Sequence, residues 1–171
     1  MDMHSDSRYG GKLASALPIW LLLLAASILI NYIDRGNLAV AAPLLKEELR
    51  LTSTQVGILI TGFFWTYIVV LAISGWICDR LNVNWVLATG FALWSLATAA
   101  TGVVHGFALL LACRMLLGLG ESVAFPSYSK MIALNAPEEH HGIANAMIIS
   151  GMSLGPAIGT YACGISMARY G

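Results

Sequence analysis

Two opposite charges stand inside an apolar stretch in the middle of the chain, at Arg114 and Glu121. They are seven residues apart, or two helical turns at about 3.6 residues per turn, so a helix would place them on one face about 10 Å apart. In a membrane helix each charge near the bilayer centre costs about 2.5–3.5 kcal/mol. A paired cation and acid on one face therefore predicts a pathway for an ion or a charged solute.

A second pair of charges, Asp34 and Arg35, interrupts the first apolar stretch. On a helix, adjacent residues point about 100° apart, so the two cannot face one partner squarely. Asn31 and Tyr32 lie one turn before Arg35 on its side of the helix, and Tyr67 adds a hydroxyl to the next apolar stretch. The structural alternative is two buried ion pairs that only tie the first helix to the fourth. Because buried pairs often fail to offset their desolvation, the functional interpretation is favoured.

The charge count suggests a mechanism for these four residues. With Asp34, Arg35, Arg114 and Glu121 all ionised, the cluster is neutral. A proton on Asp34 or Glu121 would leave the cluster positive and free a guanidinium for a bidentate carboxylate. The hypothesis is that a proton and an organic anion bind together.

Other chemistry has little support in the sequence. His140 and His141 adjoin two glutamates, which is more typical of a solvated surface than of a metal site. Neither a spaced metal-ligand set nor a nucleophile motif or phosphate loop is present. The three cysteines have no paired spacing and behave as small apolar residues. We expect no metal, no cofactor and no enzymatic activity, and zero net charge argues against a nucleic-acid partner.

Composition identifies the elements that must position the charges. The chain is 58% hydrophobic and 11% charged, with a mean hydropathy of +0.76, whereas soluble domains carry about 25% charged residues. Four runs lack Asp, Glu, Lys and Arg and exceed the roughly 20 residues that span a bilayer: 13–33, 51–78, 81–113 and 140–168. The runs are solid rather than alternating, which favours helices over a barrel. We expect an all-α, polytopic protein of the lipid bilayer.

Five membrane helices are predicted. Pro43 should end the first, the segment 46–50 should be a loop, and Thr52 to Thr54 offer an N-cap for the second. Residues 1–14 form a polar tail, predicted to be cytoplasmic because four Lys or Arg would then lie inside against three outside. The predicted helices cover residues 17–41, 53–77, 85–104, 107–134 and 142–168.

Small residues recur along the last predicted helix. Gly151, Gly155 and Gly159 follow at four-residue spacing with Pro156 among them, a pattern that lets another helix approach closely. This pattern is explained by packing within the chain, or by association with a partner protein.

Three stretches resemble one family. Residues 31–38 (NYIDRGNL) and 114–126 (RMLLGLGESVAFP) are similar to the helix 1 and helix 4 signatures of the anion:cation symporters, a family of the major facilitator superfamily that includes sugar-acid permeases. Residues 75–80 (GWICDR) are similar to the start of the superfamily's loop between helices 2 and 3. The resemblance covers about residues 15–171 and corresponds to an N-terminal half.

The resemblance implies roles for the residues that match. Arg35 and Arg114 would engage the substrate or its coupled acid, with Tyr32, Tyr67 and Asn31 among the substrate-binding residues, and Asp34 and Glu121 would be the proton-coupling acids. Gly75, Asp79 and Arg80 would belong to a gating loop. The substrate would be a small organic anion such as a hexonate, hexuronate or aldarate, carried across the cell membrane with protons.

Members of the family have twelve helices in two halves that rock around a midplane site. Residues 15–171 supply five, so we expect an incomplete N-terminal domain that is inactive without its C-terminal half. Two alternatives remain. One is a non-transporting membrane protein that pairs through helix 142–168. The other, an intramembrane enzyme, lacks a nucleophile or metal set.

Overall fold

A computed structural model describes residues 19–170, and the tail predicted at 1–14 lies outside the described residues. No strand occurs between residues 19 and 170. The helices are α1 (Ile19–Glu48), α2 (Ser53–Arg80), α3 (Val83–Thr101), α4 (Phe107–Glu121), α5 (Ala124–Asn135), the 3₁₀ turn η1 (Glu138–His140) and α6 (His141–Tyr170).

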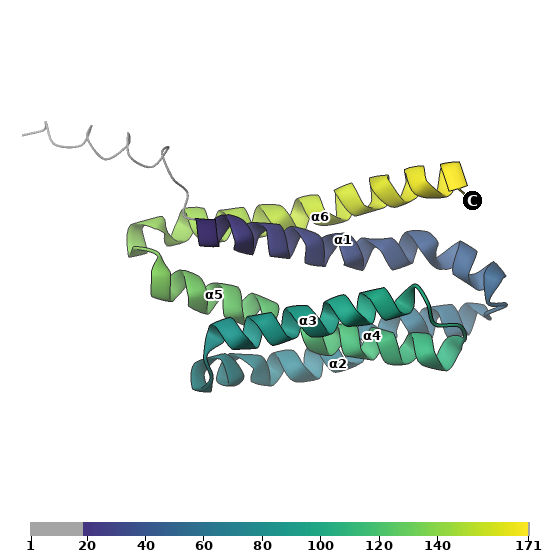
Figure 1. Ribbon diagram of the computed structural model, residues 1–171, viewed down its shortest axis with the longest axis horizontal. Helices are drawn as coiled ribbons and strands as arrows, with labels where there is room; N and C mark the ends of the chain where they lie inside the picture. The colour runs from purple at the N-terminus through teal and green to yellow at the C-terminus, as the bar shows by residue number, and fades with distance from the viewer. Residues whose placement is uncertain (1–18, 171) are drawn as a thin grey trace, which may run out of the picture.

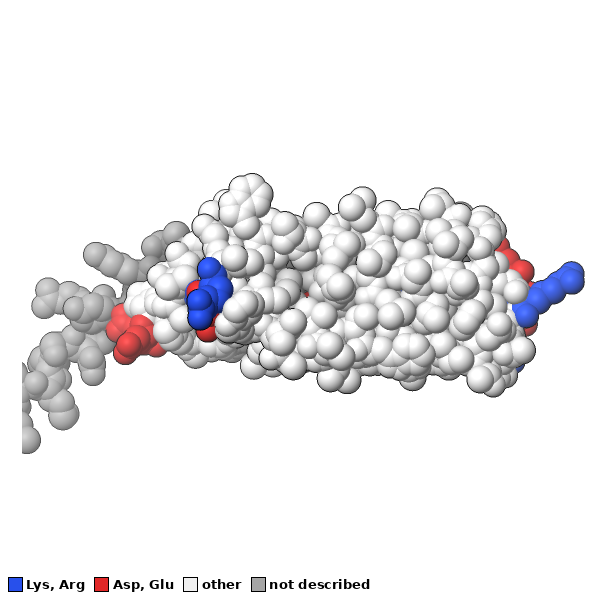
Figure 2. Space-filling model, turned by 90° about the horizontal axis from the view of Figure 1, so that it is seen from below, with Lys and Arg blue, Asp and Glu red and all other residues white. Residues whose placement is uncertain are grey.

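Five segments of the described chain are long and apolar enough to cross a membrane, with α4 and α5 together making one of them. The expected all-helical, five-span architecture is confirmed. Figure 1 shows the spans side by side, with α1 beside α6 and with α2, α3 and α4 grouped below. The described Lys, Arg, Asp and Glu visible in Figure 2 gather at the two ends of the bundle, and the surface between is a broad uncharged belt. A belt of this kind suits the hydrocarbon core of a bilayer.

The α1–α6 contact explains the glycine spacing. A Cβ on Gly155 would lie 2.6 Å from Tyr32 Cβ, and one on Gly151 would lie 2.5 Å from Ile28 Cγ2. The carbonyl oxygen of Pro156 faces Gly36 of α1, and Gly159 is buried. Because α1 of the same chain occupies this face, the face is not open for a partner protein.

The α2, α3 and α4 group also packs through glycines. A Cβ on Gly118 would collide with the backbone of Phe63 and with the Thr66 hydroxyl on α2. Thr66 Oγ1 then donates a 2.6 Å hydrogen bond to the carbonyl oxygen of Met115. On the other side of α4, Gly120 meets Gly90 of α3 backbone to backbone. α4 is therefore packed closely against α2 on one side and α3 on the other, and this packing fixes the positions of its charged residues.

The fourth span differs from its prediction as a single helix over 107–134. It divides at Ser122 and Val123, directly after Glu121. Pro126 has no N–H to donate to the carbonyl of Ser122, four residues earlier, and the backbone bonds resume with Ser127 N to Val123 O. The proline thus weakens the helix beside the buried acid.

The first span is longer than predicted. Pro43 does not end α1, and residues 46–48, expected in a loop, are helical. Proline removes one backbone bond, and a helix packed against neighbours can continue past it. The last turns of α1 bend away from α6 in Figure 1. The next link is shorter than predicted, because α2 continues to Arg80 and α3 begins at Val83 after an N-cap at Asn82.

Candidate functional site

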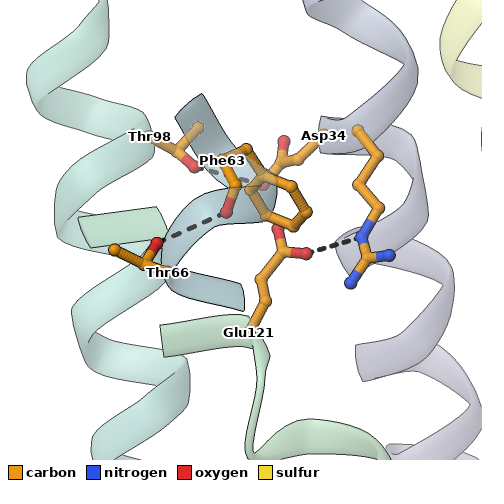
Figure 3. A network of polar contacts seen from close by, with 6 residues as sticks. Asp34, Phe63, Thr66, Thr98 and Glu121 are labelled. Carbon is orange, nitrogen blue, oxygen red and sulfur yellow. Dashed lines mark hydrogen bonds and ion pairs between the residues drawn. The ribbon is translucent and has the colours of Figure 1, made fainter. Parts of the chain in front are cut away.

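The Glu121 carboxylate is held by an arginine from another helix. Arg35 Nε on α1 donates to Glu121 Oε2 on α4 at 2.6 Å, and the Glu121 side chain has no exposed surface. Figure 3 shows this acid between the helices with its carboxylate pointing to the bond. Glu121 is thus paired across to α1, and among the described residues it forms no ion pair with Arg114 of its own helix.

Aromatic rings enclose the other sides of Arg35. Its guanidinium carbon lies 4.6 Å from the ring centre of Tyr32, 5.0 Å from that of Phe63 and 4.7 Å from that of Tyr67. The rings of Phe63 and Tyr67 stack on each other at 5.2 Å. Such rings attract a cation electrostatically, by about 0.5–2 kcal/mol each according to desolvation. Arg35 therefore keeps favourable neighbours when its bond to the acid breaks.

Asp34 faces a different helix. Thr98 Oγ1 on α3 donates to Asp34 Oδ2 at 3.3 Å, as Figure 3 shows. The angle of about 100° between adjacent helical residues explains why Asp34 meets α3 while Arg35 meets α4. The two acids are thus separately bound, one by a hydroxyl and one by an arginine.

A cavity of about 490 Å³ lies beside Asp34. It lies between the C-terminal halves of α1, α3 and α6 and includes Arg114 of α4. Arg114 makes no hydrogen bond or ion pair with the described residues (19–170). Arg114 is half-buried in the cavity wall, and both acids, Glu121 and Asp34, lie near its charge. The hydroxyl groups that line the cavity belong to Thr98, Thr101 and Ser166.

Asn31, expected near the substrate, is 1% exposed, and its side chain lies beside the Glu121 carboxylate. Asn31 is therefore an internal neighbour of Glu121, and it is not among the residues that line the cavity.

The residues expected in a gating loop lie on the last turns of α2. Asp79 pairs with Lys130 of α5 at 3.3 Å, and Lys130 also donates to the carbonyl oxygen of Cys78. Arg80 lies over the Trp76 ring at 5.7 Å, and Gly75 is exposed. The connection itself is only Leu81 and Asn82.

Three contributors to the site have weak sequence signals. Thr98 and Phe63 have no charge or motif that marks them. They contribute through contacts with another helix, Thr98 with Asp34 and Phe63 with Arg35. Lys130 is marked by its charge, but its partner is 51 residues away. Among residues 19–170 no three His, Cys, Asp or Glu side chains gather as a metal site would require.

An apolar bundle of five spans, with two arginines and two acids on its inner faces, defines a multi-pass membrane protein with a polar interior. The chain belongs to the Major Facilitator Superfamily, whose family model matches residues 24–171.

Curated relatives include transporters of organic anions. The chain is 33% identical to the hexuronate transporter of Bacillus subtilis over 83% of this chain and 33% of that protein. It is 36% identical to a probable sulfoacetate transporter of Cupriavidus necator, over 75% of this chain and 30% of that protein. Identity to the D-galactonate transporter of Escherichia coli is 31%, over 80% of this chain and 32% of that protein. The chain thus spans about a third of the length of these relatives, which are transporters and not enzymes.

Proposed function

We propose that the chain provides part of the substrate site of a proton-coupled transporter for a sugar acid, such as a hexonate, hexuronate or aldarate, in the cell membrane. The observation that carries the proposal is Arg114, a cation in a cavity wall without an ionic partner among the described residues. A guanidinium binds a carboxylate through two parallel hydrogen bonds. The hydroxyls of Thr98, Thr101 and Ser166 suit the hydroxyl groups of a sugar acid.

Coupling to protons follows from the second arginine. While Glu121 is ionised, it neutralises Arg35 through the 2.6 Å bond. A proton on Glu121 removes that counter-charge and leaves the cluster of two arginines and two acids net positive. The anion then restores neutrality, so binding of the proton favours binding of the sugar acid, and binding of the sugar acid favours binding of the proton. Tyr32 and Tyr67 keep Arg35 in place during the exchange.

The match covers only about a third of each relative, so we propose that transport needs helices equivalent to the rest of those proteins. The alternative of a non-transporting protein that pairs through α6 has no supporting observation, because α1 covers Gly151 and Gly155. In the proposed orientation the N-terminus is cytoplasmic.

Binding to the chain itself tests the substrate class. Radiolabelled galactonate, glucuronate and glucarate are titrated onto the purified chain in lipid nanodiscs, with neutral glucose for comparison. Arg114→Gln should weaken binding of the acids by at least tenfold, about 1.4 kcal/mol, because a charge-assisted bidentate contact is lost. Arg80→Gln is the matched control, since Arg80 lies on an exposed end against Trp76. Equal binding by Arg114→Gln, or equal binding of glucose, would contradict the proposal.

Uptake tests the coupling. Cells that express the gene with its downstream coding sequence should accumulate the sugar acid, and a protonophore should abolish accumulation while removal of sodium should not. Glu121→Gln should bind the anion but no longer accumulate it. Unchanged proton-driven accumulation in this variant would overturn the proposed role of Glu121.

A further inference from the structure

Two buried atoms next to each other lack partners. Among the described residues, Asn31 Nδ2 and Glu121 Oε1 are the side-chain atoms that are buried and make no hydrogen bond. One is a donor and the other an acceptor. Both residues are 1% exposed, and the Asn31 amide lies beside the Glu121 carboxylate. An unmet buried polar group costs about 1–3 kcal/mol, so a small side-chain rotation that joins these two atoms is strongly favoured.

A neighbouring contact fixes the two helices in the register that this bond needs. Ser27, one turn before Asn31, lies 2.7 Å from the hydroxyl of Tyr128, which is two turns after Glu121. The Ser27 hydroxyl donates its only hydrogen to the carbonyl oxygen of Leu24, so Tyr128 donates to Ser27. Since Tyr128 is buried, this bond holds α1 against α4 and α5 with Asn31 level with Glu121.

The two carboxylate oxygens of Glu121 therefore have different environments. Oε2 accepts the bond from Arg35, whereas Oε1 faces the amide. We propose that Asn31 positions Glu121 by donating from Nδ2 to Oε1, which directs an incoming proton to Oε2. The proton cancels the charge of the carboxylate, so the charge-assisted bond from Arg35 Nε becomes a weaker hydrogen bond to a neutral acid, and Arg35 is free to take another anionic partner. Asn31 thus makes protonation of the acid and release of the arginine one event.

This inference rests on the proposed proton coupling. It makes Asn31, an uncharged residue, a positioning residue for Glu121. Charged and titratable side chains from α1, α4 and α5 surround Glu121. Tyr67 of α2 belongs with them because it contacts Arg35. They are Asp34, Arg35, Tyr32, Arg114, Tyr128 and Tyr67. None of them faces Oε1 with a hydrogen bond, so the amide is the group that distinguishes the two oxygens.

Infrared difference spectroscopy of the purified chain in nanodiscs tests the proposal without transport. Acidification should produce a carboxylic acid C=O band that Glu121→Gln removes. Asn31→Leu, which is close in volume and cannot donate, should move this band to higher wavenumber, because the carbonyl loses its hydrogen bond. Ser74→Ala is the control: it removes a buried hydroxyl whose hydrogen bond stays within its own helix, to the carbonyl oxygen of Leu71, and it should leave the band in place.

Each outcome has one meaning. A band that keeps its position in Asn31→Leu would overturn the role of Asn31 and leave the proposed function intact. If no band depends on Glu121, the acid takes no proton, and the proposed coupling fails together with this inference. Should Asn31→Leu fail to fold, Asn31→Ala serves as the second variant, because alanine has no donor for Oε1 and the same upward shift is expected.

Discussion

Arg35 has two kinds of partner, and only one of them can be removed by a proton. The Glu121 carboxylate neutralises the guanidinium, while Tyr32, Phe63 and Tyr67 hold it through their ring faces. A proton on the acid cancels the first interaction and leaves the second unchanged. The arginine can therefore change its ionic partner without losing its position in the bundle.

Removing one partner of the Arg35–Glu121 pair should lower the free energy of unfolding far more than removing both. Arg35→Met leaves the Glu121 carboxylate buried without a cation, which should destabilise the fold by on the order of 3–5 kcal/mol. Adding Glu121→Gln removes the stranded charge and should restore most of that loss. Thermal unfolding in detergent, followed by circular dichroism, measures the double-mutant cycle. Strictly additive effects would show that the 2.6 Å pair has no energetic coupling.

The charged residues of the site could be named from the sequence, but their pairing could not. The spacing of Arg114 and Glu121 does put them on one helix, yet the acid reaches across to Arg35. Spacing within a helix says nothing about which helix lies opposite. Thr98 and Phe63 show the same limit, since their roles follow only from the approach of α3 and α2 to α1.

At the scale of helices, glycines decide how close the charges come. Gly118 lets α4 touch the α2 backbone at Phe63, and the same contact brings the Phe63 ring against Arg35. A side chain at position 118 would push α2 from α4 and open the aromatic enclosure of Arg35. The geometry of the site therefore depends on a residue without any side chain.

Gly118→Ala should accordingly destabilise the protein by about 1–3 kcal/mol, the usual cost of overpacking. Gly57→Ala is the control on α2, because its Cβ would meet nothing within 4 Å and alanine is the better helix former. Unfolding midpoints of the two variants in the same detergent make the comparison. A Gly118→Ala variant as stable as Gly57→Ala would contradict the close contact.

The number of spans could be predicted from the sequence, whereas several helix ends could not. Long apolar runs fix the spans, because each must bury its backbone polar groups inside a helix. Pro43 and Pro126 show why the ends are harder. Both lack an N–H, yet α1 continues through Pro43 and the fourth span divides before Pro126. The missing N–H alone therefore does not decide whether a helix continues or divides.

At the scale of the whole molecule, the links alternate between two ends of the bundle. The connection between α3 and α4 lies at the end where α1 stops, and η1 lies at the end where α1 begins. With charges at the two ends and an uncharged belt between them on the face in Figure 2, each link faces water on one side of the membrane.

Labelling of single cysteines should reveal this alternation. Cys78, Cys113 and Cys163 are first replaced by alanine, and a membrane-impermeant maleimide is then added to intact cells. His105→Cys should react, whereas Glu138→Cys should react only after the cells are permeabilised. The reverse pattern would invert the proposed orientation, and labelling of both from one side would contradict the arrangement of the helices.

The adjacency of Asp34 and Arg35 restricts how α1 can move. One residue bonds to α3 and the next to α4. A spin of α1 about its own axis would break both contacts at once, whereas a tilt that carries α3 and α4 along breaks neither. Together the two bonds act as a torsional lock. Release of Arg35 removes the bond to α4, while the Ser27–Tyr128 bond and the glycine contacts with α6 still hold α1, so the charge on Glu121 sets how firmly the middle of α1 resists rotation.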